Sequence, residues 1–176
     1  MLIQNSEITI RHLVSDDINE RYLQWMSDKE INRYLESRFT QFDLQELQRH
    51  FDIYLEQGAL FLAIEDSVSN LHIGNLKIGP VNPNHKTADI GILIGDPDFR
   101  GRGIAAQAIK MVTDYAFENL GVSRLFCGIY EANTASIRAF QKAGYKIEGV
   151  LVRHVVLDGV RSNTLILGQN AHPDYR

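Results

Sequence analysis

The first part of the chain changes from an alternating pattern of apolar and polar residues to a helical one. Apolar positions alternate with polar ones over 7–14, which predicts a strand. Ile18, Tyr22 and Trp25 then follow at spacings of four and three, which predicts a helix capped by one of the polar residues at 15–17. Further helices are expected at about 29–35 and from Phe42-Asp43 to a stop at Gly58.

Short apolar runs separated by polar turns, and then helices alternating with strands, make up the rest of the chain. The runs predict antiparallel strands. Asn133 is expected to cap a later helix, and Asp158-Gly159 predicts a tight hairpin before a loose tail at 169–176. The elements expected here are strands at about 59–66, 71–80, 86–95, 124–130, 145–157 and 160–167, and helices at about 103–120 and 133–143.

Length and composition narrow the class of protein. The 176 residues are 44% hydrophobic and 23% charged, which is ordinary for a globular chain, so we expect a single domain over 1–176. No apolar run approaches the ~20 residues of a membrane helix, and no secretory pattern opens the chain. Cys127 is the only cysteine, which excludes an internal disulfide and favours a cytoplasmic location. A net charge of −4 without a basic run argues against a nucleic-acid partner.

The stretch 89–105 carries the most chemical information. A buried strand ends near Gly95, a turn with Pro97 follows, and Arg100-Gly101-Arg102-Gly103 leads directly into an amphipathic helix. Glycines let a backbone approach a ligand closely, and a helix N-terminus presents unpaired N–H groups with a partial positive charge. These features indicate a pocket for phosphate or pyrophosphate, and the alternative is an ordinary tight turn. The spacing fits neither G-x-x-x-x-G-K-(S/T) nor G-x-G-x-x-G in its βαβ context.

Three segments resemble the GNAT acetyltransferase superfamily. The residues Arg100-Gly101-Arg102-Gly103-Ile104-Ala105 match its acetyl-CoA motif, (Q/R)-x-x-G-x-(G/A). Asn133 to Ser136, then Phe140, then Gly144-Tyr145, are similar to its second motif. The segment 25–35 resembles the branch that contains ribosomal-protein N-terminal, polyamine and amino-sugar acetyltransferases.

The resemblance implies a fold and a cosubstrate. It implies an α/β (α+β) GNAT-like acyl-CoA N-acyltransferase fold, in which helices flank a curved, mostly antiparallel sheet of about seven strands, with the domain core at about 7–168. It also implies acetyl-CoA as cosubstrate, no metal, and direct transfer of the acetyl group to a primary amine. The coenzyme-binding residues that it implies are Leu93, Ile94 and Gly95 for the pantetheine arm, Arg100, Gly101, Arg102, Gly103, Ile104 and Ala105 for the pyrophosphate, and Asn133 and Phe140.

The group that protonates the departing thiolate is expected on the second motif or just before it. Many members of the family have tyrosine where this chain has Phe140, which has no proton to give. Ser136 matches a serine that the branch is thought to use, and Tyr130 is the alternative. The substitution at Phe140 weighs against a polyamine acetyltransferase and favours, as a rival, a non-catalytic acyl-CoA-binding or sensor module. A longer acyl group is a second rival. Cys127 is expected to be buried in its strand rather than nucleophilic.

Three residues are candidates for the general base: Asp89, Glu131 and His154. Each has a plain structural alternative, as a strand carboxylate, a solvated loop residue or a histidine on a sheet face. The other histidines, His12, His50, His72, His85 and His172, are expected on the surface.

The amine acceptor is expected to meet the first helices and the final hairpin. Trp25, Arg33, Tyr34 and His154 are the candidates for contact, although the aromatic residues have core packing as the alternative. The arginines suit a phosphate or carboxylate on the acceptor, whereas acidic neighbours suit a cationic amine or peptide. The apolar run 155–157 belongs either to a homodimer interface or to the core.

Overall fold

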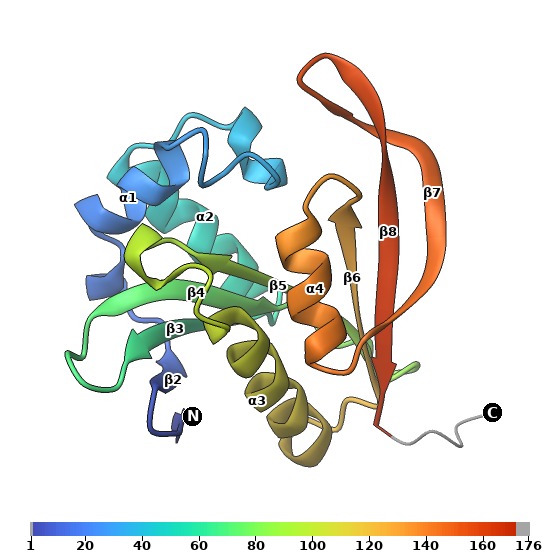
Figure 1. The fold of residues 1–176 in the computed structure, drawn as a ribbon. Coiled ribbons are helices and arrows are strands. Elements are labelled where there is room, and N and C mark those ends of the chain that lie inside the picture. Colours follow the sequence, from blue (N-terminus) through green and yellow to red (C-terminus); the bar gives the residue numbers. More distant parts are fainter. Residues whose placement is uncertain (1, 172–176) are drawn as a thin grey trace. The chain divides into compact units, whose positions relative to one another are not determined.

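The computed structural model describes residues 2–171 of the chain. These residues form two compact units. The first combines the chain up to residue 80 with 92–104, and the second combines 81–91 with the chain from 105 on. Strand β5 (Thr87–Ile94) therefore begins in the second unit and ends in the first (Figure 1).

The first unit is an antiparallel ladder with helices. The strands pair in the order β1-β2-β3-β4, and the sequence between β2 and β3 forms the helices. Tyr22, Trp25 and Met26 on α1 pack with Leu47 on α2 in one buried cluster. The bounds of the elements are β1 Leu2–Gln4, β2 Ile8–His12, η1 Ser15–Asp17, α1 Glu20–Ser27, η2 Glu36–Phe39, α2 Leu44–Glu56, β3 Leu60–Asp66, β4 His72–Ile78 and η3 Pro97–Phe99, where η marks a 3-10 helix.

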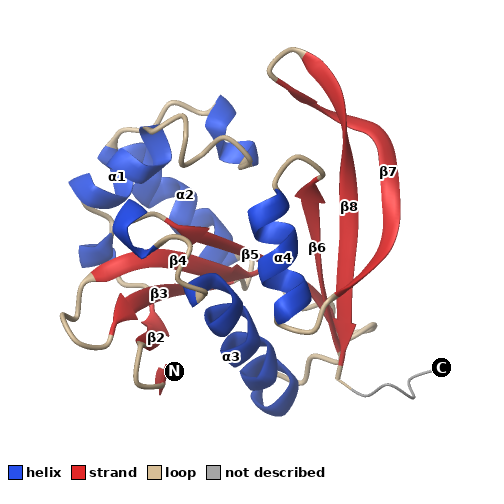
Figure 2. Ribbon diagram, in the orientation of Figure 1, coloured by secondary structure: helices blue, strands red, loops and turns tan. Residues whose placement is uncertain are grey.

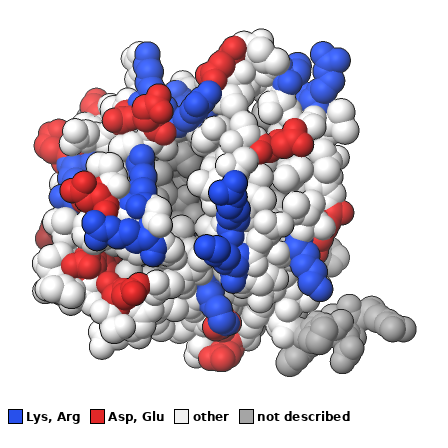
Figure 3. All heavy atoms as spheres, viewed as in Figure 1, with Lys and Arg blue, Asp and Glu red and all other residues white. Residues whose placement is uncertain are grey.

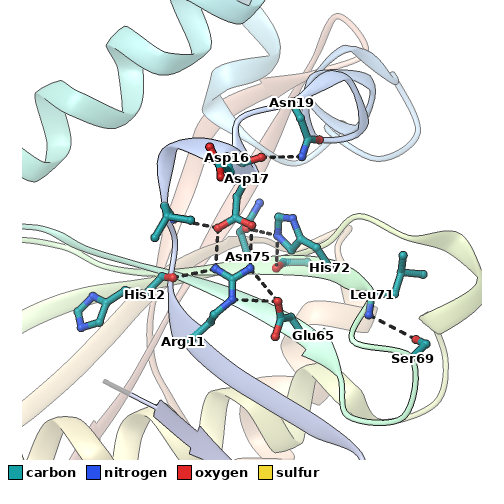
Figure 4. Close-up of polar contacts among 12 residues, drawn as sticks. Arg11, His12, Asp16, Asp17, Asn19, Glu65, Ser69, Leu71, His72 and Asn75 are labelled. Carbon is teal, nitrogen blue, oxygen red and sulfur yellow. Dashed lines mark hydrogen bonds and ion pairs between the residues drawn. The ribbon is translucent and has the colours of Figure 1, made fainter.

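A polar network ties the turn before α1 to the strands (Figure 4). The Arg11 guanidinium donates to both carboxylate oxygens of Asp17, at 2.7 and 2.8 Å, and its Nε donates to Glu65 at 2.9 Å. His72 Nε2 lies 2.8 Å from Asn75 Oδ1, and its ring meets Trp25 edge-on at 5.1 Å between centroids. These contacts join η1 to β2, β2 to β3, and the last turn of α1 to the start of β4.

The second unit is a mixed ladder with two helices. The first residues of β5 pair in parallel with β6 (Arg124–Tyr130), which pairs antiparallel with β8 (Val160–Asn170), and β8 pairs with the edge strand β7 (Lys146–Leu157). The β7–β8 hairpin extends beyond the end of β6 (Figure 2). The helices are α3 (Ile104–Asn119), whose first residue belongs to the first unit, and α4 (Thr134–Lys142).

Buried residues of α3, β6 and β8 form the interior of the second unit. Ala108, Ile109 and Val112 of α3 are completely buried, as are Leu125 of β6 and Leu167 of β8. The buried hydroxyls of Thr113 on α3 and Tyr145 are hydrogen-bonded at 2.8 Å. The hairpin tip is Asp158-Gly159, and both residues have positive φ, as a two-residue hairpin turn of this sequence requires.

Most predicted elements are confirmed, and three details were wrong. Residues 29–35 form turns rather than a helix, and Asn19, not a residue of 15–17, caps α1. β8 continues to Asn170, so residues 169 and 170 are not part of a loose tail, while 172–176 lie outside the described residues. The described chain has eight strands, which agrees with the expected sheet of about seven and adds the short β1, paired with β2. No helix within 2–171 is long and apolar enough to cross a membrane.

Candidate functional site

The turn after β5 is fixed by the neighbouring strand and by its own side chains. Gly95 N–H and Asp96 N–H both donate to the carbonyl of Ile73, at 3.0 and 3.1 Å. Asp96 Oδ1 accepts from Asp98 N–H at 2.9 Å and so caps η3. The chain is therefore held before it reaches the glycines that follow.

Arg100 closes this turn from the other side. Its Nε donates to the carbonyl of Ile94 at 3.0 Å, and its Nη2 donates to that of Gly95 at 3.2 Å. Its own amide donates to Pro97 O at 3.2 Å. The arginine of the first motif thus acts on the protein backbone, and its amide already has an acceptor.

Residues 101–103, which we call the glycine loop, present main-chain donors to the outside. Gly101 and Gly103 have φ of +74° and +82°, a conformation that other residues seldom adopt. The amides of Gly101, Arg102 and Gly103 have no protein acceptor within the described residues. α3 begins at the next residue, so the positive end of its dipole lies behind these donors. Successive main-chain N–H groups in such a turn form a concave anion-binding site, called a nest.

Part of the expected pantetheine site is already used by the protein. Leu93 and Ile94 are half-buried at the end of β5, but the amide of Gly95 is bonded to Ile73. The parallel ladder between β5 and β6 ends at the pair Asp89 and Phe126. Beyond Phe126, the described pairings of β6 are with β8 alone and continue to the pair Tyr130 and Thr164.

The second motif forms the start of α4. Asn133 caps the helix, and its Oδ1 accepts from Ser136 N–H at 3.2 Å. The Ser136 side chain is half-buried, and its hydroxyl has no partner among residues 2–171. Phe140 is 2% exposed and meets the Tyr145 ring edge-on at 5.0 Å. In the structure Asn133 is therefore a helix cap, and Phe140 is a core residue.

Comparison with known proteins decides the family. The model of the acetyltransferase (GNAT) domain matches residues 7–146, about four fifths of the chain. The chain belongs to the GNAT acetyltransferase family. A spermidine N(1)-acetyltransferase of Vibrio cholerae is 25% identical to it over 158 residues, which cover 88% of each chain.

Solved structures show the same fold. A crystal structure of spermidine N-acetyltransferase from Vibrio cholerae in complex with CoA and spermine aligns with a TM-score of 0.83 at 21% identity, over 95% of this chain and 97% of that one. A ribosomal L7/L12 α-N-protein acetyltransferase in complex with coenzyme A aligns with a TM-score of 0.83 at 19% identity, over 97% and 98% of the two chains. The expected α+β GNAT fold is thus confirmed.

The three candidate bases of this GNAT acetyltransferase lie in different surroundings. Glu131 Oε2 accepts from Asn163 Nδ2 at 3.0 Å, and its amide donates to Asn163 O at 3.0 Å. His154 lies exposed in an irregular part of β7, where the register shifts between Leu151 and Val155. Asp89 is half-buried on β5 and lies near Cys127. Asn163 therefore fixes the position of the Glu131 carboxylate.

Cys127 is buried in β6, as expected. Burial raises the pKa of its thiol to about 12, and the nearby Asp89 carboxylate acts in the same direction. A thiol with this pKa is almost entirely protonated at neutral pH and is a poor nucleophile. Tyr130, the alternative proton donor, is also buried, at 5% exposure.

The candidates for the acceptor site fall into two groups. Trp25 is 4% exposed and packs in the buried cluster that α1 and α2 share. Arg33 and Tyr34 are half-buried, with the guanidinium 5.5 Å from the ring centroid. Side chains of both signs are interspersed on the face of the molecule that Figure 3 shows.

Sequence reasoning missed two features of the site. His72 is not a surface residue but is half-buried beside Trp25, and burial lowers the pKa of its imidazole. Arg21 and Asp96 form an ion pair between α1 and the turn after β5. Neither contact has a local signal, because the partners are far apart in the sequence.

Proposed function

We propose that this chain transfers the acetyl group of acetyl-CoA directly to a primary amine while both substrates are bound. The observation that carries the proposal is the glycine loop, whose three main-chain donors bond nothing else in the described protein and directly precede the start of α3. These donors suit the pyrophosphate of the coenzyme. The family membership names that coenzyme.

The chemistry asks for two further groups from the protein. The attacking amine must be neutral, and a lysine-type amine with an ordinary pKa of ~10.4 is charged at pH 7, so it needs a base. Glu131 is our choice, because Asn163 holds its carboxylate in place. The departing thiolate needs a proton, and Ser136 is our choice, because its hydroxyl is not engaged in the described protein.

The acceptor that we propose is a small amine, an amino sugar or a protein N-terminus. Relatives bear the names of spermidine and ribosomal-protein acetyltransferases, and both kinds of acceptor present a primary amine. We also propose that the chain forms a homodimer through β7. This edge strand exposes Val150, Leu151, Val152 and Val156, by between 41% and 74%, which is unusual for apolar residues unless a partner covers them.

Calorimetry and an acceptor screen test the proposal together. Acetyl-CoA should bind the wild-type chain, and release of free CoA should follow addition of one class among polyamines, amino sugars and N-terminal peptides. Ser136→Ala should lower kcat and leave the dissociation constant for acetyl-CoA unchanged, because its side chain acts only on the departing group. Ser162→Ala, on β8, is the matched control and should behave as wild type.

Two outcomes would contradict the proposal in different ways. No heat on adding acetyl-CoA would remove its basis. Tight binding without turnover for any amine would instead identify a sensor module, which the Phe140 substitution favours. Faster reaction with propionyl- or succinyl-CoA would change the acyl group and leave the rest of the proposal intact.

A further inference from the structure

Two contacts join α1 to the turn that precedes the glycine loop. Arg21 Nη2 is ion-paired with Asp96 Oδ2, although the two residues are 75 positions apart in the sequence. One helical turn along α1, the Trp25 indole lies against the backbone of Gly95 so closely that a Cβ at Gly95 would be 2.0 Å from Trp25 Cδ2. Any larger residue at Gly95 would therefore displace either the helix or the turn.

The ion pair differs from an ordinary surface pair in its surroundings. Asp96 is 8% exposed, and its two oxygens accept from different elements, Oδ2 from Arg21 and Oδ1 from the amide of Asp98. The Arg21 guanidinium lies 5.5 Å from the Trp25 ring centroid, and its Nε is buried without a partner among the described residues. A carboxylate shielded from water is costly to leave unpaired, whereas an exposed pair contributes little.

The backbone that these contacts hold is the support of the glycine loop. Gly95 and Asp96 donate to Ile73 O on β4, and Arg100 closes the far end by bonding the carbonyls of Ile94 and Gly95. The sheet thus fixes one side of residues 95–100, and α1 fixes the other side. The position of residues 95–100 therefore sets the direction in which the glycine loop leaves them.

We propose that Arg21, Trp25 and Asp96 form a latch that holds the glycine loop in its binding shape before the coenzyme arrives. They are positioning residues for acetyl-CoA, since they act through the backbone of residues 95–103, and this assignment rests on the proposed function. A coenzyme that binds only the latched loop has its apparent dissociation constant multiplied by the inverse of the latched fraction. Breaking the latch therefore weakens coenzyme binding and leaves the chemical step unchanged once the coenzyme is bound.

The test compares Asp96→Asn with a matched ion-pair variant in the intact chain. Glu46→Gln removes the same kind of charge from the pair between Arg49 and Glu46, whose side chains are 66% and 42% exposed. We measure acetyl-CoA binding by calorimetry, the KM for each substrate, kcat, and hydrogen exchange of a peptide that covers residues 101–104.

If Asp96→Asn reduces the latched fraction to about a tenth, the dissociation constant and KM for acetyl-CoA rise roughly tenfold. We expect kcat and the KM for the amine to stay at their wild-type values, exchange at 101–104 to become faster, and Glu46→Gln to change none of these. Arg21→Lys keeps the charge and should recover part of the affinity, whereas Arg21→Met should not.

A coenzyme affinity within twofold of wild type in Asp96→Asn, or unchanged exchange at 101–104, would overturn the latch while the proposed function stands. Failure of the wild-type chain to bind acetyl-CoA would overturn the proposed function and this assignment together. If Asp96→Asn does not fold, Arg21→Met and Trp25→Phe test the same latch from α1 and are judged by the same measurements.

Discussion

Replacing Gly103 with alanine isolates the contribution of backbone conformation to coenzyme binding. The residue has φ of +82°, and a Cβ added there would meet no atom within 4 Å. The substitution therefore causes no collision and removes no side chain, so its whole effect comes from the left-handed backbone.

The size of the effect follows from the cost of that conformation. An ordinary L-residue pays about 1–2 kcal/mol to be left-handed, so the free loop of Gly103→Ala is expected to relax to another conformation. Binding must then restore the original one. Because each 1.4 kcal/mol is a factor of ten, the dissociation constant for acetyl-CoA should rise about 5- to 30-fold.

Gly58 provides a matched control at the end of α2. Its φ is +84°, and a Cβ there would also meet nothing within 4 Å. Gly58→Ala should lower the free energy of unfolding by about 1 kcal/mol without changing coenzyme affinity. Urea unfolding and calorimetry on both variants give the comparison. Equal coenzyme affinity in Gly103→Ala and Gly58→Ala would refute the idea that main-chain donors of the glycine loop bind the coenzyme.

Three further predictions concern groups that hold the fold. Thr113→Val leaves the buried Tyr145 hydroxyl without its partner at 2.8 Å, so urea unfolding should show a loss of about 1–3 kcal/mol. Burial raises the pKa of Asp17, but its hydrogen bonds from Arg11 more than offset this and the net pKa lies below its usual value. The stabilisation from Asp17 is therefore present above about pH 4, the ordinary pKa of aspartate, and is lost as the pH falls through the folded-state pKa, so Asp17→Asn should flatten the acid limb of thermal melts. Because burial raises the pKa of Cys127 to about 12, a thiol reagent should label it only after unfolding, and rapid labelling of the native protein would contradict its buried placement.

Elements whose signals are local could be predicted from the sequence. α2, α3, α4 and β6 lie within two residues of their predicted positions. Apolar spacing marks the buried face of α2 and α3, and in α2 and α4 a cap, Asp43 or Asn133, bonds the amide three residues on. Such signals depend only on neighbours in the sequence, so the positions of these elements can be predicted without knowing the tertiary contacts.

The helix predicted at 29–35 shows where local reasoning fails. Asp28 Oδ1 accepts from the amides of Glu30 and Ile31, and Asn32 Nδ2 donates to Met26 O at 2.6 Å. Asp28 thereby caps a single turn, which the Asn32 amide closes on Asp28 O at 2.9 Å. The Leu35 amide then donates to Asn32 O, only three residues back, so the turn does not continue as an α-helix. The buried position of Asn32 is a tertiary feature, and apolar spacing alone gave no warning of it.

The candidate site divides in the same way. The glycine loop was predictable, because glycines before an amphipathic helix are a local pattern. The role of Arg100 as a backbone clamp was not, because the motif predicts a charge near a phosphate while the structure shows it bonded to Ile94 and Gly95. The burial of Trp25 also depends on contacts with distant segments.

If the glycine loop binds the coenzyme as proposed, recognition by the main chain explains why so short a motif marks the site without fixing its orientation. Every amino acid except proline has such a main-chain donor, so the motif specifies only where the chain bends, through Gly101 and Gly103. The direction from which the loop approaches its ligand comes from outside the motif, from Ile73 on β4 and from Arg21 and Trp25 on α1. A chain with the same motif but a different α1 would carry the donors without their orientation. The first helix and the coenzyme loop should therefore be treated as one binding unit when this enzyme is altered.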